Sequence, residues 1–115
     1  MARAASESAR ERVRLAELEV KQQVDRALAA HEEACARTVS LSRAVEAFTE
    51  VVRIEKLMLE AGSGTQTDYL DAEADLVTAK AHLVEARHSE ILTMVELARL
   101  TGELDIEWID RNLEN

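Results

Sequence analysis

Two short stretches of this 115-residue chain hold residue types that bind metals in other proteins. The stretch EARH places Glu85 and His88 at the Glu-x-x-His spacing of di-iron helical bundles. Such a site needs further carboxylates that converge from other helices, and the chain places none for it. The stretch HEEAC mixes ligand types between His31 and Cys35 but has no second cluster to complete a site. We therefore expect no metal site.

A third stretch, Gly62-Ser63-Gly64-Thr65, resembles a phosphate-binding loop only in its glycines, because it lacks the lysine and the length of a P-loop. The chain shows no nucleophile grouped with a base and an orienting residue. We predict that the protein is not an enzyme and binds no cofactor. Cys35 is the only cysteine, which excludes an internal disulfide, and its alanine-rich surroundings favour a small packed side chain.

The overall composition excludes two further classes of function. The chain carries a net charge of −9, and its arginines do not cluster into a basic patch, so we expect no nucleic-acid partner. No stretch approaches the roughly 20 apolar residues of a spanning helix, so we expect no direct membrane insertion of this segment. The opening residues, MARAASESARERVR, lack the apolar core of a signal peptide.

A long first helix is predicted over residues 8–61. Ser8 and Glu11 form a capping-box pattern, with Ser6 as an alternative start, and no helix-breaking residue follows before Gly62. Apolar residues recur at alternating steps of four and three, the spacing of a coiled coil. This Ala9 row comprises Ala9, Val13, Ala16, Val20, Gln23, Ala27, Ala30, Ala34, Arg37, Leu41, Ala44, Phe48, Val51, Glu55 and Met58. Only Gln23, Arg37 and Glu55 interrupt this row. A weaker Val24 row comprises Val24, Leu28, Cys35, Val45, Val52 and Leu59.

A second helix is predicted over residues 66–101, because Gly62 suits the left-handed position after a helix and Thr65 with Asp68 suits the next N-terminus. It carries two apolar rows on nearly opposite sides and one polar row. The Leu70 row comprises Leu70, Ala74, Val77, Ala81, Val84, His88, Ile91, Val95 and Ala98. The Ala72 row comprises Ala72, Leu76, Ala79, Leu83, Ala86, Glu90, Thr93, Leu97 and Leu100. The polar Asp68 row comprises Asp68, Asp71, Asp75, Thr78, His82, Glu85 and Ser89.

These elements predict an all-α fold, a single long antiparallel hairpin with its turn near residues 62–66. The stretch after Gly102 adds a short helix over residues 105–113. Two apolar rows on one helix predict neighbours on both sides, as in a wall of helices. Folding back at the turn sets Thr101 opposite about Arg26, which leaves the start of the first helix uncovered. For the isolated chain we expect an antiparallel dimer that forms a four-helix bundle, with a trimer as the alternative.

The residues from Arg53 to Leu104 resemble the second repeat of TolC-like outer-membrane efflux proteins. The family pattern is a helix that ends in aromatic-x-Ala-Gly, a Gly-Thr stretch, an acid, Leu-Asp-Ala, and a closing Leu-x-x-x-Gly. The matching residues read LEAGSGTQTDYLDAEADLVTAKAHLVEARHSEILTMVELARLTGEL. The chain departs from the pattern at Leu59, where an aromatic residue is usual, and at Met58, where a basic residue is common.

The resemblance implies that the segment belongs to the periplasmic α-barrel of an efflux or type I secretion channel, with three chains in the full-length assembly. It implies that the turn residues, Gly62, Ser63, Gly64, Thr65 and Gln66, contact a membrane-fusion (adaptor) protein. It also implies that Asp68 and Asp71 line the narrow entrance of the tunnel. Without the resemblance, Asp68 is a capping acid and Asp71 is a solvated acid of the first helical turn.

A second class of function remains open on the sequence alone. Two long helices with coiled-coil periodicity also suit a self-associating hairpin scaffold, or the hairpin of an adaptor protein that meets such a tunnel. The specific spacing of the turn residues favours the channel segment over this generic alternative.

Overall fold

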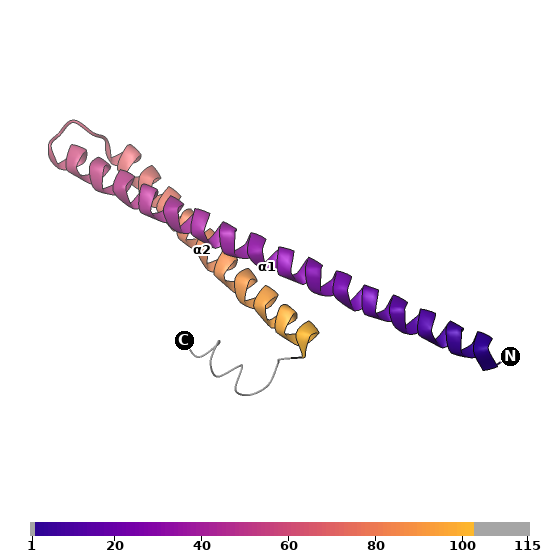
Figure 1. The fold of residues 1–115 in the computed structure, drawn as a ribbon. Coiled ribbons are helices and arrows are strands. Elements are labelled where there is room, and N and C mark those ends of the chain that lie inside the picture. Colours follow the sequence, from indigo (N-terminus) through magenta and orange to yellow (C-terminus); the bar gives the residue numbers. More distant parts are fainter. Residues whose placement is uncertain (1, 103–115) are drawn as a thin grey trace. The chain divides into compact units, whose positions relative to one another are not determined.

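The computed structural model describes residues 2–102, which form two α-helices joined by a short turn (Figure 1). Helix α1 spans Ala2–Glu60 and helix α2 spans Gln66–Thr101. No strand occurs within this described range. The predicted all-α hairpin with its turn near residues 62–66 is therefore confirmed. The helix predicted over residues 105–113 lies outside the described residues.

Helix α1 begins at Ala2, six residues before the predicted start at Ser8. The segment before Ser8 contains three alanines and neither glycine nor proline, so nothing in it interrupts helical propensity. The helix therefore continues through the Ser8–Glu11 capping pattern instead of beginning there. At its other end, α1 stops at Glu60, and Gly62 follows with a φ of +81°.

The chain divides into two compact units. One consists of residues 33–91, and the other contains the start of α1 and the end of α2. Within the 33–91 unit, the Ala72 row of α2 faces α1. Ala72, Ala79, Leu83 and Ala86 are buried, and Ala86 is only 2% exposed. Alanine at most of the buried positions of this row leaves room for the two helices to pack closely along a narrow seam.

The residues of α1 that face α2 include only part of the predicted Ala9 row. Ala34, Leu41, Phe48 and Glu55 of that row are buried or half-buried. The intervening positions toward α2 are taken by Thr38 and by three members of the Val24 row, which are half-buried: Val45, Val52 and Leu59. Arg37, Val51 and Met58 also belong to the predicted Ala9 row, but they are exposed. This rotation keeps aliphatic side chains against α2 and leaves the Arg37 guanidinium in water, which avoids the cost of burying a charge.

A polar contact inside the 33–91 unit defines how the antiparallel helices align. Cys35 Sγ donates to Glu90 Oε1 at 3.3 Å, and the cysteine is half-buried. The sequence predicted a packed apolar cysteine at this position, whereas the structure adds a carboxylate partner. The Leu70 row of α2 points away from α1 in the same unit, with Val77 67% exposed and Val84 66% exposed.

The other unit is held by a short stretch of contact between α1 and α2. Ala27 and Ala98 are buried there, and His31 Nδ1 lies 3.0 Å from Thr93 Oγ1. All residues from 2 to 23 are exposed, and we call this stretch the N-terminal arm. Exposed apolar side chains along the arm include Val13, Leu15, Leu18 and Val20.

Candidate functional site at the interhelical turn

The turn is closed by hydrogen bonds that converge on one carbonyl of the last turn of α1. Met58 O accepts from Ser63 N and from Gly64 N, each at 3.0 Å, and from Ser63 Oγ at 3.3 Å. Gly62 N donates to Leu59 O at 3.1 Å. Gly62 can adopt the positive φ that this turn needs because glycine has no Cβ. The chain reversal is therefore built from backbone groups alone, apart from one serine.

Gly64 is required by space and not by its backbone angles. A Cβ placed on Gly64 would lie 3.0 Å from Met58 Cβ and 3.1 Å from Leu59 N. The second contact is with backbone, which cannot move aside as the end of a flexible side chain does. Gly62, by contrast, has open space where a Cβ would lie. The two glycines of the predicted site therefore serve different physical purposes.

Thr65 caps the start of α2, as its spacing to Asp68 predicted. Its Oγ1 accepts a hydrogen bond from Asp68 N at 3.1 Å, and its carbonyl accepts from Tyr69 N at 3.2 Å. Capping satisfies one of the backbone donors that a helix leaves open at its N-terminus. The Asp68 carboxylate also lies in the first turn of α2, where the helix dipole favours negative charge.

The structure places the predicted site residues together at the turn and leaves most of them accessible. Gly62, Ser63, Thr65 and Gln66 are exposed, and Gly64 is half-buried. Asp68 and Asp71 are both exposed and lie three residues apart on one side of α2. Within residues 2–102, no lysine or arginine forms an ion pair with either aspartate. The turn therefore presents small residues bordered by two unneutralised carboxylates.

A tyrosine–glutamate pair beside the turn was not among the predicted site residues. The pKa of the Tyr69 phenol is raised above its ordinary value, first by its hydrogen bond to the Glu73 carboxylate. Partial burial and the charges of Glu73 and Glu60 raise this pKa further. The signal available in the sequence was the four-residue spacing of Tyr69 and Glu73, which places both side chains on one side of a helix.

The other chemical candidates do not assemble into a site. Glu85 and His88 are both exposed, although the sequence placed His88 in an apolar row. Among the described residues, no group of three or more His, Cys, Asp or Glu side chains is arranged to hold a metal ion. Neither described helix contains a stretch long enough and apolar enough to cross a membrane.

The fold and the turn define a long helical hairpin with an exposed, acid-bordered tip. A family model described as outer membrane efflux protein matches residues 1–103. This chain therefore belongs to the outer membrane efflux protein family, and the resemblance seen at the turn is confirmed.

One curated relative is the alkaline protease secretion protein AprF of Pseudomonas aeruginosa. The two sequences are 35% identical over 65 residues, which is 56% of this chain and 14% of AprF. This chain thus spans only a small part of the length of the relative that it matches. No solved structure matches the chain.

Proposed function

We propose that this chain forms a periplasmic α-barrel segment of an outer-membrane efflux or type I secretion channel. Membership of the outer membrane efflux protein family supports the channel, and the likeness to AprF, a secretion protein by name, supports the secretion role. The role of the segment is transport and docking, not catalysis. In a full-length parent, three copies enclose the tunnel, and the exposed Leu70 row meets a neighbouring helix of the wall.

The tip of the hairpin docks a membrane-fusion (adaptor) protein in this proposal. The observation that carries it is the convergence of Ser63 and Gly64 on the Met58 carbonyl, which fixes the shape of the turn without bulky side chains. A partner backbone can approach small residues closely, and a preformed surface loses little conformational entropy on binding. The docking surface comprises Gly62, Ser63, Gly64, Thr65 and Gln66.

Asp68 and Asp71 line the tunnel at its periplasmic entrance. Their exposure on one side of α2 and their lack of a cationic partner among the described residues support this role. Rings of carboxylates attract cations and bias conduction in channels. Three copies of the pair would concentrate six negative charges at one constriction, in keeping with the three-chain assembly proposed above.

Conductance of a trimeric channel that carries this segment tests the role of the acids. Asp68→Asn with Asp71→Asn should weaken the dependence of conductance on divalent cations and leave trimer assembly intact. Glu46→Gln with Glu50→Gln, on α1 and away from the turn, is the matched control. Unchanged cation dependence in the Asp68/Asp71 variant would remove these acids from the pore lining, and lost trimers would make them structural.

Site-directed crosslinking tests the docking surface. In a Cys35→Ala background, Ser63→Cys gives a single thiol at the turn, and Ser40→Cys gives a matched, equally exposed thiol on α1. We expect a maleimide crosslinker to join the turn variant to the cognate adaptor in membranes and to leave the Ser40 variant uncoupled. Equal coupling at both positions, or none at the turn, would contradict docking through the tip.

A further inference from the structure

The polar Asp68 row of α2 continues along the helix beyond the two aspartates near the turn. Four further members follow Asp71 at steps of four, three, four and three: Asp75, Thr78, His82 and Glu85. This spacing places all four on the side of α2 that carries Asp71. Each of them is exposed. A polar face with one histidine among its acids therefore extends from the turn into the middle of α2.

The lysine and the arginine that α2 contributes to the 33–91 unit lie on the opposite side of the helix. Lys80 follows the buried Ala79, which Thr78 precedes, and Arg87 follows the buried Ala86 in the same way. At about 100° per residue, the residues before and after a buried position lie on nearly opposite sides of a helix. The fixed positive charges of this part of α2 are thus kept away from the Asp68 row.

His82 lies at the centre of an open groove between α1 and α2 in the 33–91 unit. The groove consists of two adjoining hollows of about 290 and 230 Å³, and His82 lines both of them. Leu41 of α1 also lines both hollows, and Phe48 lines the second. The groove therefore has an apolar side on α1, with the imidazole of His82 on its α2 side.

Three charged side chains line these hollows beside His82. Helix α2 brings Glu85 to the first hollow and Asp75 to the second, and α1 brings Arg37 to the first. Within residues 2–102, none of the four groups takes part in an ion pair. Two carboxylates and one guanidinium give the groove a net charge of −1 while His82 is neutral, and a proton on His82 brings that charge to zero. The histidine alone thus decides whether the groove is negative.

We propose that this groove forms the wall of the tunnel beyond its entrance and that His82 sets the ion selectivity of that wall. The proposal rests on the proposed function, which places Asp68 and Asp71 at the entrance. Because His82 shares their side of α2, a lumen that meets Asp71 also meets His82. The eleven residues from Asp71 to His82 place the histidine about 16 Å deeper in the tunnel.

The charge of His82 gives the direction of the pH dependence. Histidine changes its charge between about pH 5 and 8, whereas carboxylates ordinarily keep theirs down to about pH 5. At pH 8 the groove is negative and adds to the preference of the entrance acids for cations. At pH 6 the proton on His82 cancels this contribution in each of the three copies. Cation selectivity should therefore fall as the pH is lowered.

Reversal potentials of a trimeric channel that carries this segment, measured in planar bilayers under a KCl gradient, test the role of His82. The ratio of cation to anion permeability should fall by about twofold between pH 8 and pH 6 in the wild type. His82→Gln should remove most of this fall, and His82→Lys should give the lower ratio at both pH values. His88→Gln is the matched control. His88 is equally exposed but belongs to the Leu70 row, so this variant should keep the wild-type response.

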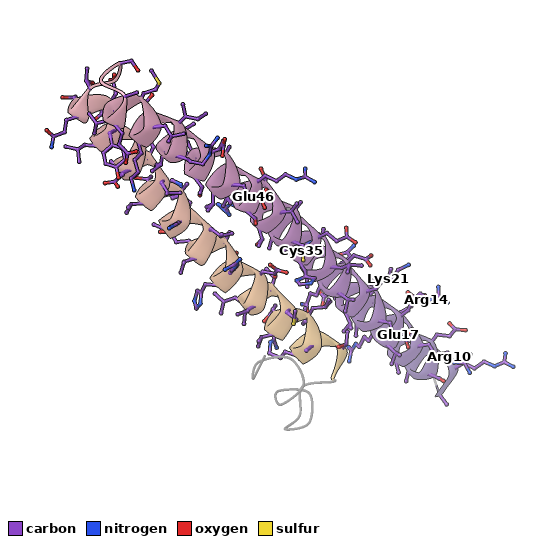
Figure 2. All side chains as sticks on the ribbon, turned by 90° about the vertical axis from the view of Figure 1, so that its left-hand side faces the viewer. Arg10, Arg14, Glu17, Lys21, Cys35 and Glu46 are labelled. Atoms are coloured by element: carbon purple, nitrogen blue, oxygen red, sulfur yellow. The ribbon has the colours of Figure 1, made fainter. Side chains whose placement is uncertain are left out.

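Thiol accessibility tests which side of the hairpin faces the lumen. Cys35, labelled on α1 in Figure 2, is the native thiol and is first replaced by alanine. Thr78→Cys then places a thiol on the groove side of α2, and Lys80→Cys places an equally exposed thiol on the opposite side. A methanethiosulfonate reagent with a trimethylammonium group should reduce the current through the Thr78→Cys channel. It should leave the current through the Lys80→Cys channel unchanged.

The outcomes separate this inference from the proposed function. A pH response of His82→Gln equal to that of the wild type would overturn the role of His82, and so would an equal loss of response in His88→Gln. Block of the Lys80→Cys channel that equals or exceeds block of the Thr78→Cys channel would overturn the lumen-facing groove. If either result occurs while Asp68→Asn with Asp71→Asn still weakens cation dependence, the entrance stands and this inference alone fails. If the aspartate variant also has no effect, the proposed pore lining fails with it.

Discussion

Gly64 lies so close to Met58 that a Cβ on the glycine would come within 3.0 Å of Met58 Cβ. The same glycine donates its N–H to the Met58 carbonyl at 3.0 Å. Met58 thus accepts the hydrogen bonds that close the turn, and it also limits the size of the side chain at position 64. Gly62 contributes in another way, through its φ of +81°.

Substitution of the two glycines should therefore destabilise the hairpin for different reasons. Gly62→Val should lower the free energy of unfolding by about 1 kcal/mol or more, because a β-branched residue resists positive φ. Gly64→Ala should lower it by about 1–3 kcal/mol, because the added methyl group meets backbone at Leu59. Urea unfolding followed by circular dichroism measures both.

Ser63→Ala is the control, since it removes only an exposed hydrogen bond of 3.3 Å and should change stability by less than about 0.5 kcal/mol. Unchanged unfolding midpoints for both glycine variants would show that the chain reverses in another way.

Loss of the Thr65 cap should shorten or destabilise α2 at its start. Thr65→Ala removes the acceptor for Asp68 N and should cost about 1 kcal/mol. Thr67→Ala, two residues on, is a matched control, because its hydroxyl makes no hydrogen bond within residues 2–102 and alanine favours the helix. Thermal unfolding of the two variants decides the matter. A Thr67 variant as unstable as the Thr65 variant would assign the effect to the loss of any threonine near the turn.

The turn and the second helix followed from local signals in the sequence. Glycine at a helix end and a threonine three residues before an acid act within one turn of the chain, so no distant partner is needed to interpret them. The start of α1 was placed too late for the converse reason. A capping pattern predicts a helix start only where the preceding residues oppose the helix, and the alanines before Ser8 do not.

The side of each helix that faces the other was harder to predict. The Leu70 and Ala72 rows of α2 share the same spacing and similar apolarity, so periodicity cannot rank them. On α1, the facing side combines parts of two predicted rows, with Leu41 and Phe48 from one and Val45 and Val52 from the other. That choice depends on how α1 and α2 fit together, which no single helix encodes.

The phenol of Tyr69 should titrate above the ordinary range for tyrosine. Because the Glu73 carboxylate accepts its hydrogen bond, the folded chain favours the neutral phenol and raises its pKa. The resulting stabilisation is present below the unfolded pKa of about 10 and is lost as the pH rises through the folded pKa.

Tyr69 is the only tyrosine, so ultraviolet absorbance of the tyrosinate measures this pKa directly. Glu73→Gln should lower the pKa toward its ordinary value, and Glu46→Gln, far along α1, should leave it unchanged. A wild-type midpoint at the ordinary value would show that the hydrogen bond does not form in solution.

Enlarging one alanine on each side of α2 distinguishes the two apolar rows of that helix. Ala86 is 2% exposed in the Ala72 row, and leucine there should lower the free energy of unfolding by about 1–3 kcal/mol through overpacking against α1. Ala81, in the Leu70 row, is exposed, so Ala81→Leu should change stability by less than about 0.5 kcal/mol. The two substitutions are chemically identical and lie in the same helix, which removes helix propensity from the comparison. Urea unfolding at one protein concentration measures both, and a larger effect at Ala81 would mean that the Leu70 row faces α1.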